Sequence, residues 1–258
     1  MEVRFYRTLW GMGGTLDEQL ARIKAAGFEG WEDWVKPHFE IKPLAEKHGL
    51  GYMAMVSGTD PEQFKHDLGE AFDCGCVGVT VHTGSSAWTY EQGAKFFEKA
   101  LPITKQFPFP INFETHRGHL LYEPNSTAAY LKEFPDLHLV ADLSHWTCVT
   151  TSMLGGYSEA LELAISRVRH IHARYGLEEG PQVPDPRVPQ WEGHVKAFEG
   201  FWDRIKDAHV KRGEKFITVD PEVGPPNYQW TDPKTGQPLA DIWDVALWTR
   251  DRLRKRWA

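Results

Sequence analysis

The chain has 258 residues, of which 41% are hydrophobic and 25% charged, and its formal net charge is −7. This is the profile of a globular protein, and the length suits either one large α/β barrel or two small domains. Nucleic acid is disfavoured as a partner, because neutralising phosphates requires clustered Lys and Arg. Only the tail Arg250–Arg256 is locally basic, and we interpret it as the solvated end of a last helix, where the helix dipole favours positive charge.

Two features of the sequence bear on its compartment. Its three cysteines are an odd number without a disulfide-like framework, which favours a reducing environment. The first residues, MEVRFYRTLWG, contain no apolar stretch of the kind found in secretory leaders, and no apolar run approaches the roughly 18 residues of a membrane span. We therefore expect a cytoplasmic protein that does not cross a membrane.

The first half of the chain alternates strand-like and helix-like segments. Strands are expected at Val3–Trp10, Phe28–Val35, Gly51–Val56 and Cys76–His82. A capping box at Thr15–Glu18 begins the first helix, and Gly27 ends it. The following helices are expected near Phe39–His48, from Asp60 through Phe72, and near Tyr90–Lys105.

The second half repeats this alternation. Strands are expected at Ile111–Thr115, His138–Asp142, Val168–Ala173 and Phe216–Asp220, and helices near Ser126–Phe134, Ser158–Ser166, Trp191–Lys211 and Leu239–Arg256. Eight strand–helix units in about 250 residues predict an α/β protein of the (β/α)₈ TIM-barrel class. A doubly wound open sheet is the alternative, but it usually has fewer strands, and the sequence lacks a G-x-G-x-x-G turn. No linker interrupts the chain, so we expect one domain over residues 1–258.

Four of the expected strands end in side chains that can bind a metal. Glu114, Asp142 and His172 end their strands, and Glu222 follows the eighth. In a TIM barrel the carboxyl ends of all strands meet at one face, so these four side chains should converge there. Taken singly, a strand-end Asp often caps the next helix, and a lone His is often a structural residue. Together, however, packed carboxylates repel each other and are costly to bury without a cation. Oxygen-rich coordination with one imidazole suits Mn²⁺ or Mg²⁺, and Co²⁺ and Zn²⁺ are feasible; we prefer Mn²⁺.

The fourth ligand is ambiguous between two residues of the same strand. Asp220 and Glu222 share a face, and Pro221 between them cannot donate to a strand ladder. Regular pairing should therefore fail near Pro221, which places Glu222 at the lip of the barrel and Asp220 one layer lower. We prefer Glu222 as the ligand and keep Asp220 as a residue that supports it.

Other polar residues at the strand ends are expected to meet a substrate. Strand alternation places His116 on the same side as Glu114, and Arg174 one layer above His172, while His82 faces the barrel interior from the fourth strand. His145 lies just past Asp142, where the chain turns. Glu32, at the end of the second strand, is interpreted as a solvated carboxylate rather than a substrate contact.

Aromatic residues and long loops surround the same face. Several tryptophans follow strand ends: Trp10, Trp31, Trp34, Trp88 and Trp146. A tryptophan in such a position either lines a pocket, where it stacks on the apolar side of a sugar ring, or fills space between the barrel and its loops. We expect Trp10 and Trp146 to contact substrate. The loops Gly176–Gln190 and Gly224–Pro238 are long for such connections, which favours a covering role, with Arg187 and Tyr228 as the residues that close over a ligand.

The segments NFETHRG, VADLSHW, HIHARYG and VDPEVGPPNY resemble those of the xylose isomerase-like TIM barrels of the sugar phosphate isomerase/epimerase type. The resemblance covers the whole chain in rhythm and is most specific at Asp142-x-x-His145. It implies one divalent metal on Glu114, Asp142, His172 and Glu222. It further implies that His145 contacts substrate or metal, that Arg174 contacts substrate, and that Glu114 and Glu222 act as an acid/base pair. Enzymes of this kind are often dimers or tetramers, so a homo-oligomer is also expected.

The chemistry of such a site is proton transfer next to a carbonyl. Moving that proton needs a base and an acid, and a metal that binds the carbonyl and a neighbouring hydroxyl stabilises the enediolate. The predicted function is therefore a metal-dependent isomerase or epimerase of carbohydrate metabolism, acting on a sugar or polyol-derived ketone. An inosose-type dehydratase starts from the same intermediate and is the first alternative, and a non-catalytic sugar-binding barrel is the second.

An apurinic endonuclease, which the same superfamily contains, is disfavoured. That branch is expected to carry three zinc ions and an Asp-x-His after the seventh strand, where this chain has Asp185-Pro186-Arg187. The third strand, GYMAMV, also offers no histidine, and the net charge of −7 opposes phosphate binding.

Overall fold

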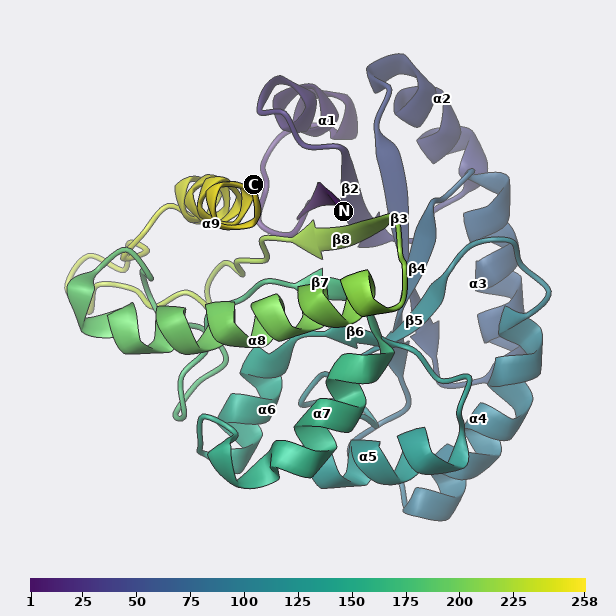
Figure 1. Cartoon of the computed structure of the whole chain (residues 1–258). Helices are drawn as coiled ribbons and strands as arrows, with labels where there is room; N and C mark the ends of the chain where they lie inside the picture. Colours follow the sequence, from purple (N-terminus) through teal and green to yellow (C-terminus); the bar gives the residue numbers. More distant parts are fainter.

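Eight parallel strands close into a barrel in the computed structural model, which describes residues 1–258 (Figure 1). Each strand pairs with the next in the sequence, and β8 pairs with β1 to close the barrel. The strands are β1 (Glu2–Thr8), β2 (Gly30–Trp34), β3 (Gly51–Gly58), β4 (Gly78–Thr83), β5 (Ile111–Glu114), β6 (Leu139–Ala141), β7 (Val168–His172) and β8 (Phe216–Asp220). The predicted (β/α)₈ fold is confirmed.

Helices surround the barrel on the outside (Figure 1). They are α1 (Leu16–Ala25), α2 (His38–His48), α3 (Pro61–Asp73), α4 (Tyr90–Thr104), α5 (Pro124–Glu133), α6 (Leu143–Thr150), α7 (Ser158–Arg167), α8 (Glu192–Lys211) and α9 (Ile242–Trp257). Local signals act as predicted at α1, where Thr15 and Glu18 form a complete capping box. The short 3₁₀ segments Gly155–Tyr157 and Pro189–Trp191 precede α7 and α8.

One helix that the sequence pattern does not predict, α6, begins immediately after β6. Asp142 caps it by accepting a hydrogen bond from the backbone N–H of Ser144. Every residue from Leu143 to Thr147 is buried, so the segment lacks the alternation of apolar and polar faces that marks a surface helix. This helix holds His145 and Trp146 close to the end of β6.

The main core lies between the strands and the helices, because the outward-facing strand residues are apolar. Phe113 of β5 is 1% exposed, and its ring contacts that of Phe97 of α4 edge-on, with the ring centroids 5.5 Å apart. Its neighbours Asn112 and Glu114 face the barrel interior, where they are also buried. The period of two therefore separates an apolar outer layer from a polar interior, as strand alternation predicts.

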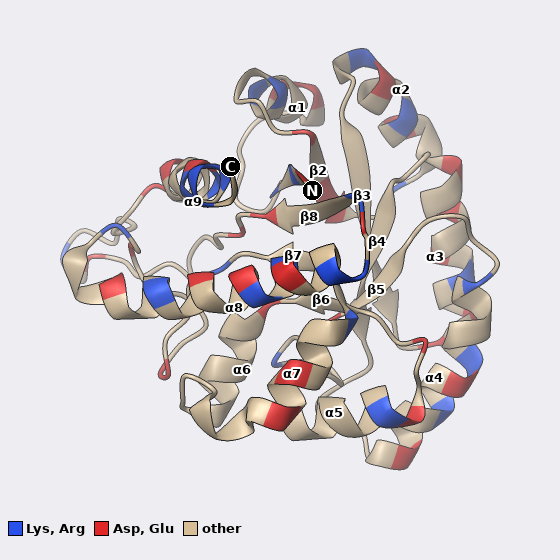
Figure 2. Ribbon diagram, in the orientation of Figure 1, with Lys and Arg blue, Asp and Glu red and all other residues tan.

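The basic tail docks α9 onto the rest of the molecule. Arg250 is buried and donates to the carbonyl of Ala26 at 2.5 Å. The half-exposed arginines that follow form ion pairs, Arg252 with Glu199, Arg254 with Glu29 and Arg256 with Asp203. The interpretation of this tail as a merely solvated helix end is therefore wrong for Arg250. Elsewhere, acidic and basic residues are interspersed over the outer helices (Figure 2). None of the helices combines the length and the apolar character that a membrane span requires.

Glycines make room for a ring inside the barrel. A Cβ added at Gly30 of β2 would lie 2.2 Å from the carbonyl oxygen of Gly51 and 2.4 Å from Cε1 of Tyr6. Tyr6 of β1 is only 4% exposed and occupies the space that a side chain from β2 would need. The absence of a side chain at Gly30 is thus a packing requirement of the barrel.

Replacing Gly30 by Ala should therefore destabilise the protein by about 2–3 kcal/mol, because the added methyl group collides with backbone and with a buried ring. Gly69→Ala in α3 is the matched control. A Cβ at Gly69 meets nothing within 4 Å, so the helix should gain about 0.5–1 kcal/mol. Urea denaturation measures both changes, and a Gly30→Ala variant as stable as the wild type would contradict this description of the packing.

Candidate functional site

Four metal-binding side chains from four strand ends meet at the carboxyl-terminal face of the barrel. Glu114 ends β5, Asp142 follows β6, His172 ends β7, and Glu222 lies two residues beyond β8. One ligand atom from each lies within 4.8 Å of the others, and none of the four residues is more than 8% exposed. Asp220, the competing residue on β8, is not part of this group of four.

Short contacts connect the four residues through His172 and Arg174. The Nδ1 atom of His172 lies 3.1 Å from Oε1 of Glu114 and 3.1 Å from Oε2 of Glu222. Arg174 donates from Nε to Oδ2 of Asp142 at 3.0 Å, and its Nη2 lies 2.6 Å from Oε1 of Glu222. The other oxygen of Asp142 accepts from the backbone N–H and the hydroxyl of Ser144. Arg174 therefore ties Asp142 to Glu222, and His172 ties Glu222 to Glu114.

The donor set fits a divalent cation. Three carboxylates and one imidazole suit ions that prefer oxygen ligands and tolerate a nitrogen. Oε2 of Glu222 and Oε2 of Glu114 are buried and accept no hydrogen bond of regular geometry; each has only an imidazole nitrogen close to it, from His172 and His82 respectively. A buried carboxylate oxygen that accepts no hydrogen bond is costly, and a bound cation relieves that cost. These four residues can hold a metal ion.

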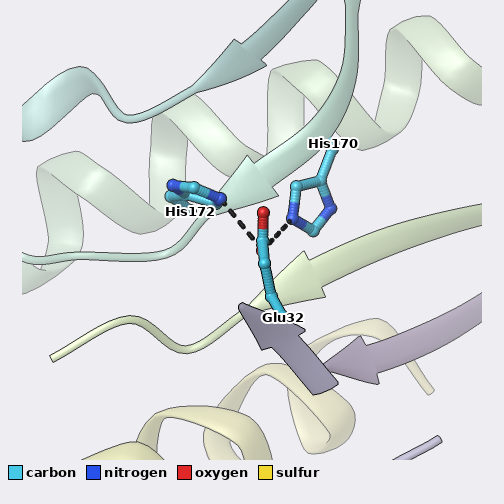
Figure 3. A group of neighbouring side chains, drawn as sticks. All are labelled: Glu32, His170 and His172. Atoms are coloured by element: carbon cyan, nitrogen blue, oxygen red, sulfur yellow. Dashed lines mark hydrogen bonds and ion pairs between the residues drawn. The ribbon is translucent and has the colours of Figure 1, made fainter. Parts of the chain in front are cut away.

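Glu32 of β2 supports the group from below (Figure 3). Its Oε2 accepts from Nε2 of His172 at 3.1 Å and from Nε2 of His170 at 3.2 Å, and Figure 3 shows the carboxylate reaching both imidazoles. The Nδ1 atom of His170 lies 2.7 Å from the hydroxyl of Thr218. Because the Nε2–H of His172 donates to Glu32, Nδ1 is the atom of that ring directed at Glu114 and Glu222.

The interpretation of Glu32 as a solvated carboxylate is wrong, since the residue is completely buried. It faces the barrel interior on the same side of β2 as Gly30, whose missing side chain leaves room for the ring of Tyr6. The alternation of inward- and outward-facing residues along a strand, which places the inward-facing side chains of β5 and β7, also places Glu32 of β2 in the barrel interior.

Charges inside the barrel shift the pKa values of these groups. Burial opposes the charged form of His172, but Glu32, Glu222 and Glu114 raise its pKa well above the ordinary value. Burial likewise opposes ionisation of Glu222, yet Arg174 and His172 lower its pKa to about 2. For Asp142 burial prevails and raises the pKa to about 6, although Arg174 acts in the other direction. Burial and the charge of Glu32 raise the pKa of Asp220 well above its ordinary range.

A cavity of about 460 Å³ opens above the four residues, and both predicted acid/base glutamates line it. Of the residues expected to meet substrate, His82, His116, Arg174 and Trp10 line this cavity as well. Nε2 of His82 lies 2.5 Å from Oε2 of Glu114. The edge of the Trp10 ring meets Tyr228 with the centroids 4.9 Å apart, so the two rings form one wall.

Two predicted substrate contacts lie away from this cavity. His145 is completely buried. Its Nε2 lies 3.5 Å from Oδ2 of Asp142, and its ring centroid lies 3.9 Å from the ring centroid of His116. Trp146 is buried in the core, and its indole N–H donates to the carbonyl of Leu121 at 3.0 Å. The expectation that Trp146 contacts substrate is therefore corrected. Successive residues of a helix point roughly 100° apart, so α6 cannot direct His145 and Trp146 to the same place.

Of the remaining aromatic and loop residues predicted to lie near a substrate, some line the cavity and others do not. Trp34 lines the cavity, whereas Trp31 is buried against Tyr52 and Trp88 packs against the core. Arg187 pairs with Asp185 on the surface and does not line the cavity, so its expected closure over a ligand has no support in this arrangement. Residues that the sequence analysis did not consider also line the cavity, namely Gln19, Asp33, Lys36 and Met55.

No family model matches the sequence, and no curated protein does. Solved structures match it in fold over almost the whole chain. Endonuclease IV from Thermus thermophilus aligns over 99% of this chain and 100% of its own, at 16% identity and a TM-score of 0.60. A sugar phosphate isomerase/epimerase from Parabacteroides distasonis aligns over 98% and 93%, at 11% identity and a TM-score of 0.63. A protein of petrobactin synthesis from Bacillus anthracis, described as a probable 3-DHS dehydratase, aligns over 97% and 98%, at 14% identity and a TM-score of 0.62.

These similarities establish the fold. Further matches include xylose isomerase domain proteins, so the predicted resemblance to xylose isomerase-like TIM barrels is confirmed at the level of the fold. The matched proteins are described as an isomerase/epimerase, a dehydratase and endonucleases, so the fold alone leaves the reaction open.

The contact with Glu32 generates a prediction for the metal-free protein. His172 should remain protonated on both ring nitrogens at a pH where an ordinary imidazole is neutral, because the carboxylates around it raise its pKa. Glu32→Gln should lower that pKa, since a nearby opposite charge stabilises the charged imidazole. Nitrogen-15 NMR of the histidine rings measures the titration. His116, whose pKa burial lowers to about 4, should stay neutral in both proteins and serves as the internal control. A neutral His172 at pH 7 in the wild type would contradict the prediction.

Proposed function

We propose that this protein is a metal-dependent sugar isomerase or epimerase, in which Glu114, Asp142, His172 and Glu222 bind one divalent cation. The observation that carries the proposal is the grouping of the four ligand atoms beside a cavity of about 460 Å³, which Glu114 and Glu222 line. Such a volume accommodates a small polar molecule. The isomerase/epimerase among the structural neighbours supports the proposal at the level of fold.

Glu114 and Glu222 are proposed to transfer the proton. A bound metal supplies Lewis-acid polarisation of a substrate carbonyl. Both glutamates line the cavity and reach it from different strands, so one can remove a proton next to the carbonyl while the other returns one. Their pKa values lie below the ordinary range in the metal-free protein, so both are deprotonated there, and the glutamate that returns a proton must first receive one.

Neighbouring residues support that transfer. His82, 2.5 Å from Glu114 and also in the cavity wall, can accept or supply the proton that Glu114 handles. Arg174 fixes Glu222 through its Nη2 and fixes Asp142 through Nε. Its guanidinium is also 4.7 Å from the ring centroid of Tyr228, so one side chain positions an acid/base group and the cavity wall together.

The substrate proposed for this cavity is a sugar or polyol-derived ketone. Trp10 and Trp34 offer apolar surfaces that suit the carbon side of a sugar, while the floor is made of charged and hydrogen-bonding groups. A binding protein without turnover would not need two glutamates at the floor. Carbohydrate metabolism, manganese as the metal, a cytoplasmic location and a homo-oligomeric state remain predictions of the sequence.

A dehydratase is the second candidate, favoured by the neighbour described as a probable dehydratase and by the shared requirement for a base next to a carbonyl. The endonuclease fold match keeps nucleic acid in view as a partner. Two observations oppose a nucleic-acid partner. After β7, where the endonuclease branch is expected to have an Asp-x-His, this chain has Arg187, which donates a hydrogen bond to Asp185. The chain also carries a net charge of −7.

Proton exchange tests the proposal. Incubation of a panel of ketoses and inososes in D₂O with Mn²⁺ should place deuterium on the carbon next to the carbonyl. Glu222→Gln should slow the exchange by about 10²–10⁴-fold, because it removes one acid/base group. Glu179→Gln, at an exposed position after β7, is the control and should leave the rate unchanged.

The products separate the two reactions. Isomerisation or epimerisation conserves the mass of the substrate apart from deuterium, whereas a dehydratase releases water. Absence of exchange across the whole panel, with metal bound, would contradict an enzyme of either kind.

A further inference from the structure

A second cavity, of about 450 Å³, lies outside the barrel beside the ends of β1 and β8. Three chain segments line it: Gly11–Gly13 after β1, Pro225–Pro226 after β8, and Asp241–Trp243 at the start of α9. Arg7 and Arg22 complete the wall together with Pro238 and Ala240. None of these residues lines the cavity above the four metal-binding side chains, so the two cavities are separate.

Arg7 is a buried charge without a partner. It lies on β1 on the outward-facing side, with Phe5 and Leu9, and it is completely buried. None of its three guanidinium nitrogens makes a hydrogen bond, and no carboxylate lies within ion-pair distance. An arginine stays charged in proteins, and burying a charge without pairing it costs several kcal/mol.

The other buried arginines show that the situation of Arg7 is exceptional. Arg174 pairs with Asp142 and Glu222. Arg250 donates to the carbonyl of Ala26 and pairs with Asp251. Arg7 is as deeply buried as either, yet it has neither kind of contact. The guanidinium of Arg7 in the cavity wall is therefore a cationic group that no other group of the protein hydrogen-bonds or pairs with.

A second guanidinium lines the same cavity. Arg22 of α1 is exposed and lies over the ring of Trp243, 3.9 Å from its centroid, without an ion pair. Its charge acts on Arg7 and helps to lower the pKa of Arg7, after burial as the main cause. The acidic group in the wall, Asp241, accepts hydrogen bonds from the backbone of Trp243 and Asp244 and so caps α9 instead of pairing with either arginine.

We propose that this cavity binds the phosphoryl or carboxylate group of a small anion between Arg7 and Arg22. The planar guanidinium fork matches two oxygens of either group, and the anion supplies the partner that Arg7 lacks. The cavity is larger than a single phosphate, so the remainder of a small organic anion fits beside it. Binding there joins the loop after β1 to the segment after β8. The proposal is independent of the metal site.

Anion binding can be measured in a buffer with a chelator, which removes any contribution of bound metal. Inorganic phosphate and succinate are titrated separately at constant ionic strength, by calorimetry and by thermal unfolding. The wild type should bind one anion per chain with a saturable rise in Tm. Comparison of phosphate with succinate tells whether the site takes a phosphoryl or a carboxylate group.

Three variants define the site. Arg22→Gln should weaken binding about tenfold or more, because it removes a charge-assisted contact at an exposed position. Arg7→Met should abolish binding. If Arg7→Met does not fold, Arg22→Gln alone tests the proposal. Lys24→Gln is the matched control, since Lys24 is exposed on the same helix, contacts Gly49 and does not line the cavity. Binding of neither anion to the wild type, or binding unchanged by Arg22→Gln, would overturn the proposal.

Discussion

The concentration of buried carboxylates inside one end of the barrel is the constraint on which the rest of the site depends. Glu32, Glu114, Asp142, Asp220 and Glu222 all face this space, and none is more than 8% exposed. The neighbouring cations, chiefly His172 and Arg174, compensate only part of this negative charge. The divalent cation that we propose at the four ligand atoms would balance this charge and would account for the carboxylate oxygens that are buried without hydrogen bonds.

The arrangement also depends on residues that position the ligands. Glu32 fixes the ring of His172, and Arg174 holds Asp142 and Glu222 in place. Because each supporting group comes from a different strand, closure of the barrel is what brings them into contact. The outer apolar layer around Phe113 and the glycines beside Tyr6 therefore serve the site indirectly, since they set the shape of the barrel.

Much of this could be predicted from the sequence, for identifiable reasons. The eight strand–helix units and the period of two within strands place Glu114, Asp142 and His172 at one face without any knowledge of contacts. Pro221 favours Glu222 over Asp220 as the residue at the lip, and Glu222 is the one whose carboxylate lies within the group of four. Trp146 could not be placed, because every residue of α6 from Leu143 to Thr147 is buried and the segment shows no amphipathic pattern. The contact of Glu32 with His172 and the isolation of Arg7 both depend on packing between segments far apart in the chain.

Metal binding to the purified protein tests the central claim most directly. Titration of chelator-treated protein with Mn²⁺, followed by calorimetry, should give one ion per chain. Affinity should fall as the pH is lowered, because protons compete for His172 and Asp142, whose pKa values are raised in the metal-free protein. Asp142→Asn should weaken binding strongly. A wild-type protein that binds no divalent ion at pH 8, while remaining folded, would contradict the account.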